Sequence, residues 1–322
     1  MRWRRGGCVA AASVVAAGVV AGVVVATGAP AQQAPTQTRA EIPPKVTCRV
    51  LPADDPINEN VSRLPVSPMS ARYIASIGLG GHLHPDFGTD PSYGIPYTVV
   101  GPDQRRVPIH FTAYGDQSDP GPYPIPSDAP VEGAGEAGDR HVLVVQNGTC
   151  KLYELYDAQR LGEGWDAGSG AAFNLRSTRL RPDGWTSADA AGLPIFPLLV
   201  RYDDVRSGVI DHALRMTVDM TQAGFIHPAT HFASSSHDPD LPPMGLRLRL
   251  KASFGLAGYT GAARIILVAL KTYGAIVADN GSSWYLTGAP DPRWNDDDLD
   301  ELKNVPGSAF EAVETGPIRH AG

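Results

Sequence analysis

The residues with the clearest capacity for acid–base chemistry lie in a predicted β-hairpin over residues 197–218. If residues 206–208 form its turn, His212 lies opposite Tyr202 and diagonal to Asp204 on the apolar face of the hairpin. Polar groups on such a face must be paired or hydrated, so a satisfied structural histidine is one interpretation. The functional interpretation is the floor of a binding cleft, in which His212 or Asp204 carries a proton.

A third acidic candidate, Asp279, ends an apolar run directly before Asn280-Gly281. The predicted catalytic set is Asp204, His212 and Asp279, and the predicted substrate contacts are Tyr202, His231, Trp284, Asp291, Arg293 and Trp294. Asp279 and Asp291 also suit turns, because an aspartate side chain readily bonds the backbone that follows it. Tryptophan rings displayed on loops suit flat, partly apolar ligands such as sugar rings.

His82, His84 and Asp86 alternate along the segment HLHPD, so an extended chain would present all three on one face. Two imidazoles and a carboxylate are suitable ligands for a metal ion, but no further ligand follows at a recognisable spacing. The alternative is a surface loop with local hydrogen bonds. The sequence therefore predicts no metal or other cofactor, and these three residues are the weak candidates for a metal site.

Short strand-like runs separated by glycine- and proline-rich turns carry these residues. One long helix is predicted over residues 260–273, with Thr260 as its N-cap and Gly274 just after its end. Next, Asn280-Gly281 between two strand-like runs predicts a tight hairpin. The other predicted strands are 95–100, 107–114, 141–146, 151–156, 172–177, 197–205, 208–218 and 246–253. This pattern predicts a mainly β fold of the β-sandwich or jelly-roll type, with one buried helix and a few short helices.

Residues 1–31 have the pattern of an export signal: a basic start, an uncharged run from Val9 to Ala26, and the small-x-small site Ala29-Pro30-Ala31. The paired Arg4-Arg5 leaves both Sec and twin-arginine export open. Residues 32–44 are predicted to be a disordered tail, and residues 45–322 a single β-rich domain. We expect a secreted, extracellular monomer with no membrane span once the leader is cleaved.

Loss of the leader, which holds three arginines and no acid, would lower the formal net charge from −7 to −10. An acidic protein is a poor candidate for binding nucleic acid, whose phosphates attract basic surfaces. Only Cys48 and Cys150 would remain. An even number of cysteines in an oxidising compartment predicts a disulfide, with two buried thiols as the alternative.

The chain also resembles a family of secreted, mostly uncharacterised bacterial proteins. The resemblance is carried by LHPDFGT, by VRYDDV followed by IDHALR, and by ADNGSSWYLTGAPDPRW, and it extends over nearly everything after the leader. Ile57 departs from the family pattern, in which a tryptophan is expected. The resemblance implies a single secreted domain and no particular chemistry.

These features favour a secreted carbohydrate-active protein, a glycoside hydrolase or polysaccharide lyase that acts on extracellular or cell-wall polysaccharide. Two alternatives stay open. One is a non-catalytic carbohydrate-binding or envelope protein, and the other is a metal-dependent hydrolase that uses His82, His84 and Asp86. Whether the chain is an enzyme depends on whether the acidic and histidine candidates share one cleft.

Overall fold

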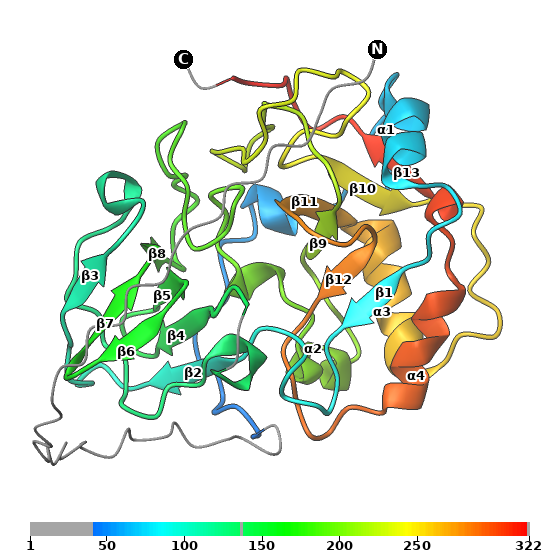
Figure 1. The fold of residues 1–322 in the computed structure, drawn as a ribbon. Coiled ribbons are helices and arrows are strands. Elements are labelled where there is room, and N and C mark those ends of the chain that lie inside the picture. The colour runs from blue at the N-terminus through cyan, green and yellow to red at the C-terminus, as the bar shows by residue number, and fades with distance from the viewer. Residues whose placement is uncertain (1–40, 136–137, 321–322) are drawn as a thin grey trace, which may run out of the picture. The chain divides into compact units, whose positions relative to one another are not determined.

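A six-stranded mixed sheet is the largest sheet in the computed structural model, which describes residues 41–135 and 138–320 (Figure 1). The predicted export signal lies outside these residues. The strands, in their order across the sheet, are β1 (His84–Asp86), β12 (Tyr285–Thr287), β9 (Leu214–Val218), β11 (Ala275–Asn280), β10 (Arg247–Leu250) and β13 (Phe310–Val313). Strand β9 runs parallel to β11 and antiparallel to β12.

Two smaller sheets are built from the first half of the described chain. The four-stranded sheet contains β2 (Tyr97–Val100), β4 (Val142–Gln146), β5 (Lys151–Tyr156) and β8 (Ser169–Asn174), and the three-stranded sheet contains β3 (Ile109–Phe111), β7 (Gly164–Ala167) and β6 (Gln159–Leu161). Figure 1 shows these two sheets on one side of the fold and the six-stranded sheet on the other. The predicted mainly β class is therefore confirmed.

The long helix predicted from its apolar periodicity is α3 (Gly261–Thr272). Thr260 occupies the N-cap position, and Gly274, with a φ of 70°, turns the chain from the helix into β11. The other α-helices of the described residues are α1 (Ser70–Ile77), α2 (Tyr202–Ser207) and α4 (Asp296–Asp300). Short 3-10 turns complete the set at Pro56–Asn58, Gly115–Gln117, Glu132–Gly135, Phe196–Leu198, Glu301–Asn304 and Gly307–Ala309.

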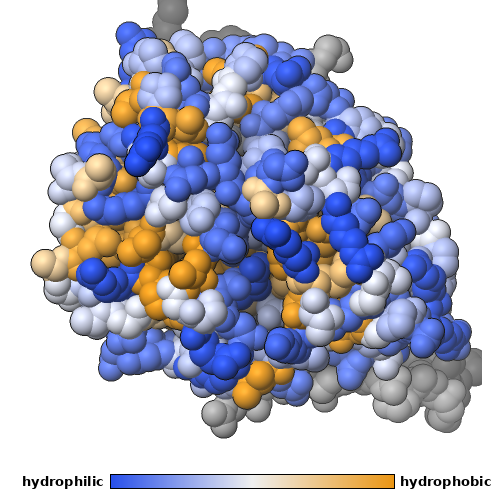
Figure 2. Space-filling model, turned by 180° about the vertical axis from the view of Figure 1, so that it is seen from behind, coloured by the Kyte–Doolittle hydropathy of each residue, from blue (hydrophilic) through white to orange (hydrophobic). Residues whose placement is uncertain are grey.

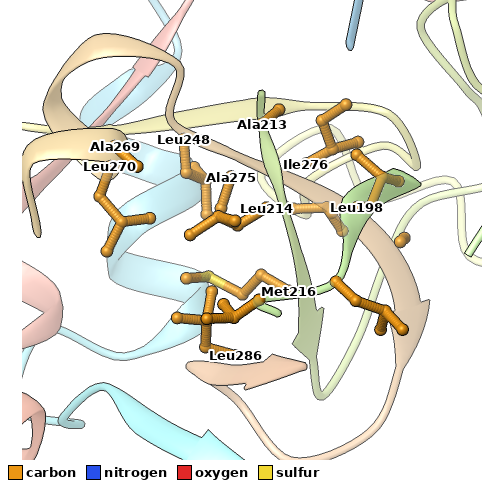
Figure 3. Packing of buried hydrophobic residues seen from close by; sticks show 14 of the residues in the cluster. Leu198, Ala213, Leu214, Met216, Leu248, Ala269, Leu270, Ala275, Ile276 and Leu286 are labelled. Atoms are coloured by element: carbon orange, nitrogen blue, oxygen red, sulfur yellow. The ribbon is translucent and has the colours of Figure 1, made fainter. Parts of the chain in front are cut away.

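The two faces of the six-stranded sheet have different surroundings. Leu214 and Met216 of β9 lie toward Ala269 and Leu270 of α3, and all four are buried (Figure 3). Ile276 points to the other side of the sheet. Because side chains alternate along a strand, Arg215 between Leu214 and Met216 must also point away from α3.

The four-stranded sheet contributes side chains to buried clusters on both of its faces, which explains why its inner strand β4 is a continuous apolar run, VLVV, rather than an alternating one. Leu143, Val145 and Leu152 join the main core with the six-stranded sheet. Val144 and Leu155 join a second cluster, together with Trp165 and Ala167 of the three-stranded sheet. The four-stranded sheet therefore lies between the other two.

The predicted hairpin over 197–218 is wrong, because residues 202–207 form α2 rather than a strand. Asp203 and Asp204 suit the first turn of a helix, and Gly208 ends it in the left-handed conformation. Of the two predicted strands only β9 forms. The hairpin predicted at Asn280-Gly281 is also wrong, since β9 lies between β11 and β12 and pairs with both.

On the face shown in Figure 2, hydrophobic residues gather in separate patches between hydrophilic ones. The most exposed large hydrophobic side chains of the described residues, Leu161, Val209 and Ile42, come from three distant parts of the chain. Within residues 41–135 and 138–320, no helix combines the length and the apolar character needed to cross a membrane.

Cys48 and Cys150 form a disulfide, as predicted, across a sequence separation of 102 residues. Cys150 lies at the start of β5 and is buried in the main core. Asn147 adds to this attachment, because its side chain accepts a hydrogen bond from Thr47 N and donates one to Lys45 O. The N-terminal arm is thus fixed to the four-stranded sheet.

We expect the double variant Cys48→Ser, Cys150→Ser to be less stable than the wild type by on the order of 4 kcal/mol, because a link of this span restricts the unfolded chain. Urea unfolding of the two proteins, each with and without reductant, measures the difference. Reductant should lower the wild-type midpoint and leave the variant unchanged. Equal midpoints for the two oxidised proteins would contradict the prediction.

Candidate functional site

A β-bulge in β11 determines which way Asp279 points. The parallel register pairs Val277 with Met216 and then Asp279 with Thr217, so Ala278 is the extra residue. Without the bulge, Asp279 would pair with Val218 and point to the apolar face covered by α3. With the bulge it shares the face of Arg215, two residues before Thr217. The backbone irregularity therefore places a carboxylate beside a buried arginine.

Arg215 is held by three oxygen atoms on this polar face. Its Nε donates to Asp189 Oδ1 at 2.8 Å, its Nη2 to Asp279 Oδ2 at 2.8 Å, and its Nη1 to Thr287 Oγ1 at 3.1 Å. The arginine side chain is only 4% exposed. Burial alone would lower the pKa of Arg215, but the Asp189 and Asp279 carboxylates outweigh burial and raise it. The guanidinium is therefore a permanent buried charge.

Asp189 reaches Arg215 from the segment between β8 and α2. Its carboxyl group is fully buried, and burial raises its pKa to about 6 although Arg215 opposes the shift. Its second oxygen, Oδ2, has no hydrogen-bond donor within the described part of the chain. The segment is held in place because Ala191 N donates to Ala278 O of β11 and Ser187 Oγ donates to Leu193 O.

Glu154 of β5 anchors the end of the same segment. Its carboxylate accepts from Ile195 N at 3.0 Å and from Phe196 N at 2.9 Å, and no part of the residue is exposed. Burial raises its pKa to about 7, although these two backbone hydrogen bonds oppose the shift. The four-stranded sheet therefore positions the segment that carries Asp189.

A buried histidine and a half-buried glutamate form a second ion pair near Arg215. His141 Nδ1 lies 2.6 Å from Glu132 Oε2, and His141 Nε2 lies 2.9 Å from Ala188 O. Both neighbours are acceptors, so both ring nitrogens must carry protons. Burial lowers the pKa of His141, but the Glu132 carboxylate outweighs it and raises the value to about 9. Burial by itself would raise the pKa of Glu132, but His141 lowers the pKa by a larger amount, so the net shift is downward.

We call Glu132, His141, Asp189, Arg215 and Asp279 the Arg215 cluster. The cluster reaches solvent at Asp279 and at Glu132, whose side chains are 19% and 22% exposed. Tyr156 lies beside His141, with ring centroids 5.8 Å apart, and Asp139 O accepts a hydrogen bond from Asp157 N next to Tyr156. Burial, and then the charges of Asp139, Asp157 and Asp279, raise the pKa of the Tyr156 phenol. Asp139 is exposed. The pKa of its carboxyl group is raised overall. Desolvation is the main cause and the charge of Asp279 adds to it, whereas the charge of His141 opposes it.

Asp86 lies on the other side of Arg215. It pairs with Thr287 in the sheet, and burial raises its pKa although His84 opposes the shift. His84, two residues earlier, stacks on Tyr285 with ring centroids 4.1 Å apart. Burial lowers the pKa of His84, so this ring is neutral at pH 7. The half-buried stack gives this side of the site a flat aromatic surface.

The structure brings Asp204 and His212 together, but through α2 rather than a hairpin. His212 Nε2 lies 3.5 Å from Asp204 Oδ2, and Arg201 Nη2 lies 2.8 Å from the same carboxylate oxygen. Burial raises the pKa of Asp204, but the Arg201 charge and His212 lower it overall. Both residues line a cavity of about 470 Å³ whose lining does not include Asp279. Their role in proton transfer stays a prediction.

Four predicted substrate contacts form one structural group. Arg293 donates to both oxygens of buried Asp291 at 2.7 and 2.5 Å and lies over the Tyr202 ring at 4.4 Å. The Tyr202 ring meets Trp294 edge-on. The prediction that Trp294 and Trp284 display their rings is wrong, because both are buried and their indole N–H groups donate to Ala289 O and Gly78 O.

His231 lies close to the Arg215 cluster in the backbone network. Its amide N and that of Thr230 donate to Ala191 O, and Ala191 N donates in turn to Ala278 O, beside Asp279. Its ring contacts Ala190 O through Nδ1 at 2.8 Å. His231 is half-buried, and these backbone hydrogen bonds connect it through Ala191 to Ala278, the residue before Asp279.

The three metal candidates separate in the structure. His84 and Asp86 share one face of β1, whereas His82 is exposed and forms an isolated bridge with Pro306. Among the described residues, no three His, Cys, Asp or Glu side chains are grouped in a way that could hold a metal ion.

Sequence reasoning missed most of the Arg215 cluster. Arg215 alternates with apolar residues in LRMTV, which is the pattern of a half-solvated strand, and Asp189 lies in a small-residue segment without a motif. Only Asp279 was among the predicted catalytic residues. One signal is the proline- and glycine-rich segment between Gly115 and Asp139, which is too long for an ordinary connection, because Glu132 lies within it and His141 follows it.

No family model, curated protein or solved structure matches this chain. The chemistry of the Arg215 cluster is therefore the basis for a functional assignment. That chemistry combines an ion-paired carboxylate at the solvent edge with a neighbouring carboxyl group of raised pKa.

The His141–Glu132 pair predicts that stability falls with rising pH. The folded-state pKa of His141, about 9, lies above the value of about 6.5 for an unfolded histidine. Its contribution is therefore complete below pH 6.5 and is lost as the pH rises to 9, by about 3 kcal/mol. Ionisation of the buried Asp189 and Glu154 also lowers the stability of the folded protein. Because their pKa values are about 6 and about 7, that loss occurs at lower pH.

Urea unfolding between pH 7 and 9.5 measures this loss. His141→Gln keeps a side chain of similar size that does not titrate, so its stability should be nearly flat over the same range. A wild-type slope equal to that of the variant would show that His141 is not charged in the folded protein.

Proposed function

We propose that this chain is an exported carbohydrate-active hydrolase whose reaction takes place at the solvent edge of the Arg215 cluster. The observation that carries the proposal is the contrast between two neighbouring carboxyl groups. Asp279 is ion-paired with Arg215 at 2.8 Å, whereas Asp139 has no such guanidinium partner among the described residues. Desolvation and the charge of Asp279 raise the pKa of Asp139, although His141 opposes the shift. Glycoside hydrolases use one protonated and one ionised carboxyl group in this way.

In this proposal Asp139 donates a proton to the leaving-group oxygen of a glycosidic bond. Asp279 acts from the other side, either on the anomeric carbon or on a water molecule that attacks it. Arg215 and Asp189 are positioning residues, because they hold the Asp279 carboxylate in place. The half-buried Tyr156, whose ring lies 5.8 Å from that of His141, suits binding of a sugar hydroxyl.

A hydrolase is favoured over a polysaccharide lyase by the pairing of Arg215. A lyase that removes a proton beside a uronate carboxylate needs a cation to neutralise the charge that develops. The Arg215 guanidinium already contacts Asp189, Asp279 and Thr287. The remaining residues of the site are mainly acidic, which suits a neutral glycan rather than an anionic one.

Export supports an extracellular or cell-wall polysaccharide as the substrate. The leader pattern and the resemblance to secreted proteins both point to it, and the Cys48–Cys150 disulfide is compatible with an oxidising compartment. The predictions of a single secreted domain and a monomer belong to the same proposal.

The test is a polysaccharide degradation screen on wild type, Asp279→Asn and Asp139→Asn. Either substitution should lower turnover about 10²–10⁴-fold, since each removes one acid–base group. Because Asp139 acts as an acid, turnover of the wild type should fall as the pH rises through its pKa. Asp157→Asn is the matched control, since it removes a half-buried carboxylate next to Tyr156 and keeps the backbone hydrogen bond from Asp157 N to Asp139 O.

Two outcomes would contradict the proposal. Wild-type turnover in Asp279→Asn and Asp139→Asn, together with loss of turnover in Asp204→Asn or His212→Gln, would move the chemistry to the 470 Å³ cavity. Binding of a glycan without any turnover would favour the non-catalytic alternative.

A further inference from the structure

A second cavity, of about 570 Å³, is lined in part by the segment that carries Asp189, through Trp185, Gly192 and Leu193. Its buried base includes Leu51, Ile57 and Leu193, and Phe173 and Trp185 also line it. Asn174, Ser177 and Arg179 are among its polar lining residues. A volume between about 300 and 1000 Å³ with an apolar lining and a few polar groups is typical of small-molecule sites.

Trp185 differs from the other described tryptophans. Trp165, Trp284 and Trp294 are buried, whereas Trp185 is half-buried and lines the cavity. Within residues 41–135 and 138–320, the indole N–H groups of Trp284 and Trp294 each donate a hydrogen bond, whereas those of Trp185 and Trp165 donate none, and of these two only Trp185 is half-buried rather than buried. An accessible indole with a free donor can contact both the apolar face and a hydroxyl of a ligand.

Arg181 fixes the aromatic walls of this cavity. Its guanidinium lies 5.6 Å from the centre of the Trp185 ring and 5.7 Å from that of Phe173. It is itself held by Asp119 Oδ2 at 2.5 Å, Gln117 O at 2.6 Å and Thr186 O at 2.8 Å, and is only 6% exposed. The two rings are therefore held before any ligand binds, which lowers the entropic cost of binding.

The cavity and the Arg215 cluster are separate but share one segment. Trp185 and Asp189 are four residues apart, and none of the five cluster residues lines the cavity. Thr230 Oγ1 donates to Trp185 O at 2.9 Å, while Thr230 N donates to Ala191 O. A ligand in the cavity can therefore be held beside the cluster without contacting it.

We propose that this cavity is a second, non-catalytic glycan-binding site. Trp185 stacks on the apolar face of a neutral pyranose ring, and Asn174 and Arg179 bond its hydroxyls. The inference rests on the proposed function for the class of ligand, but not on catalysis at the cluster. Aromatic rings beside planar polar side chains recognise both the flat and the hydroxylated surfaces of such a ring.

Calorimetric titration with cellohexaose, mannohexaose, xylohexaose and N-acetylchitohexaose tests the proposal. At least one should bind saturably to wild type and to Asp279→Asn with the same affinity. Trp185→Ala should weaken that binding at least about tenfold, and Trp185→Phe, which keeps a ring, by much less. Asn174→Ala should weaken it about three- to tenfold, the effect of one lost hydrogen bond.

The results separate this inference from the proposed function. Binding that depends on Trp185, without cleavage of any glycan, would support the second site and contradict the hydrolase. Cleavage with binding that Asp279→Asn abolishes and Trp185→Ala leaves unchanged would contradict the second site. Absence of saturable binding by all four hexasaccharides to Asp279→Asn would also overturn it. Equal melting temperatures of Trp185→Ala and Trp185→Phe exclude misfolding as the cause of a difference.

Discussion

The arrangement of the site depends on one buried guanidinium. A charge as deeply buried as that of Arg215 costs several kcal/mol in lost hydration unless acceptors surround it. Three separate parts of the chain supply those acceptors: the segment with Asp189, the bulge with Asp279, and Thr287 of β12. Each of these parts is irregular or short, so strand pairing alone does not determine its position. The need of the buried guanidinium for acceptors contributes to it as well.

The need to balance the buried charges also involves the segment that leads into the four-stranded sheet. Asp189 and Asp279 exceed the single charge of Arg215, and the protonated His141 adds a second positive charge nearby. Glu132 in turn keeps His141 protonated, which fixes a segment that follows a glycine-rich turn. The Arg215 cluster occupies interior space that apolar side chains would otherwise fill. The α3 face and the four-stranded sheet supply apolar burial elsewhere.

Local patterns were sufficient for α3, for most strands and for the disulfide, because apolar periodicity, caps and cysteine number are properties of neighbouring residues or of composition. They failed at α2, because the β-rich context predicts a strand for YDDVRS. The two aspartates at its start and Gly208 at its end instead favour a short helix. They also failed at Trp284 and Trp294, since loop position does not determine burial. Arg215 could not be recognised, because its acceptors lie 26, 64 and 72 residues away. The bulge that turns Asp279 toward it has no sequence signature of its own.

The central claim is that Arg215 and the buried Asp189 are energetically coupled within the folded protein. A double-mutant cycle with Arg215→Met, Asp189→Asn and the combined variant, measured by urea unfolding at pH 7, tests it most directly. We expect a coupling free energy of about 1–3 kcal/mol, because each single substitution leaves its buried neighbour without its charge pair. A coupling below about 0.5 kcal/mol, the level found for independent sites, would contradict the account.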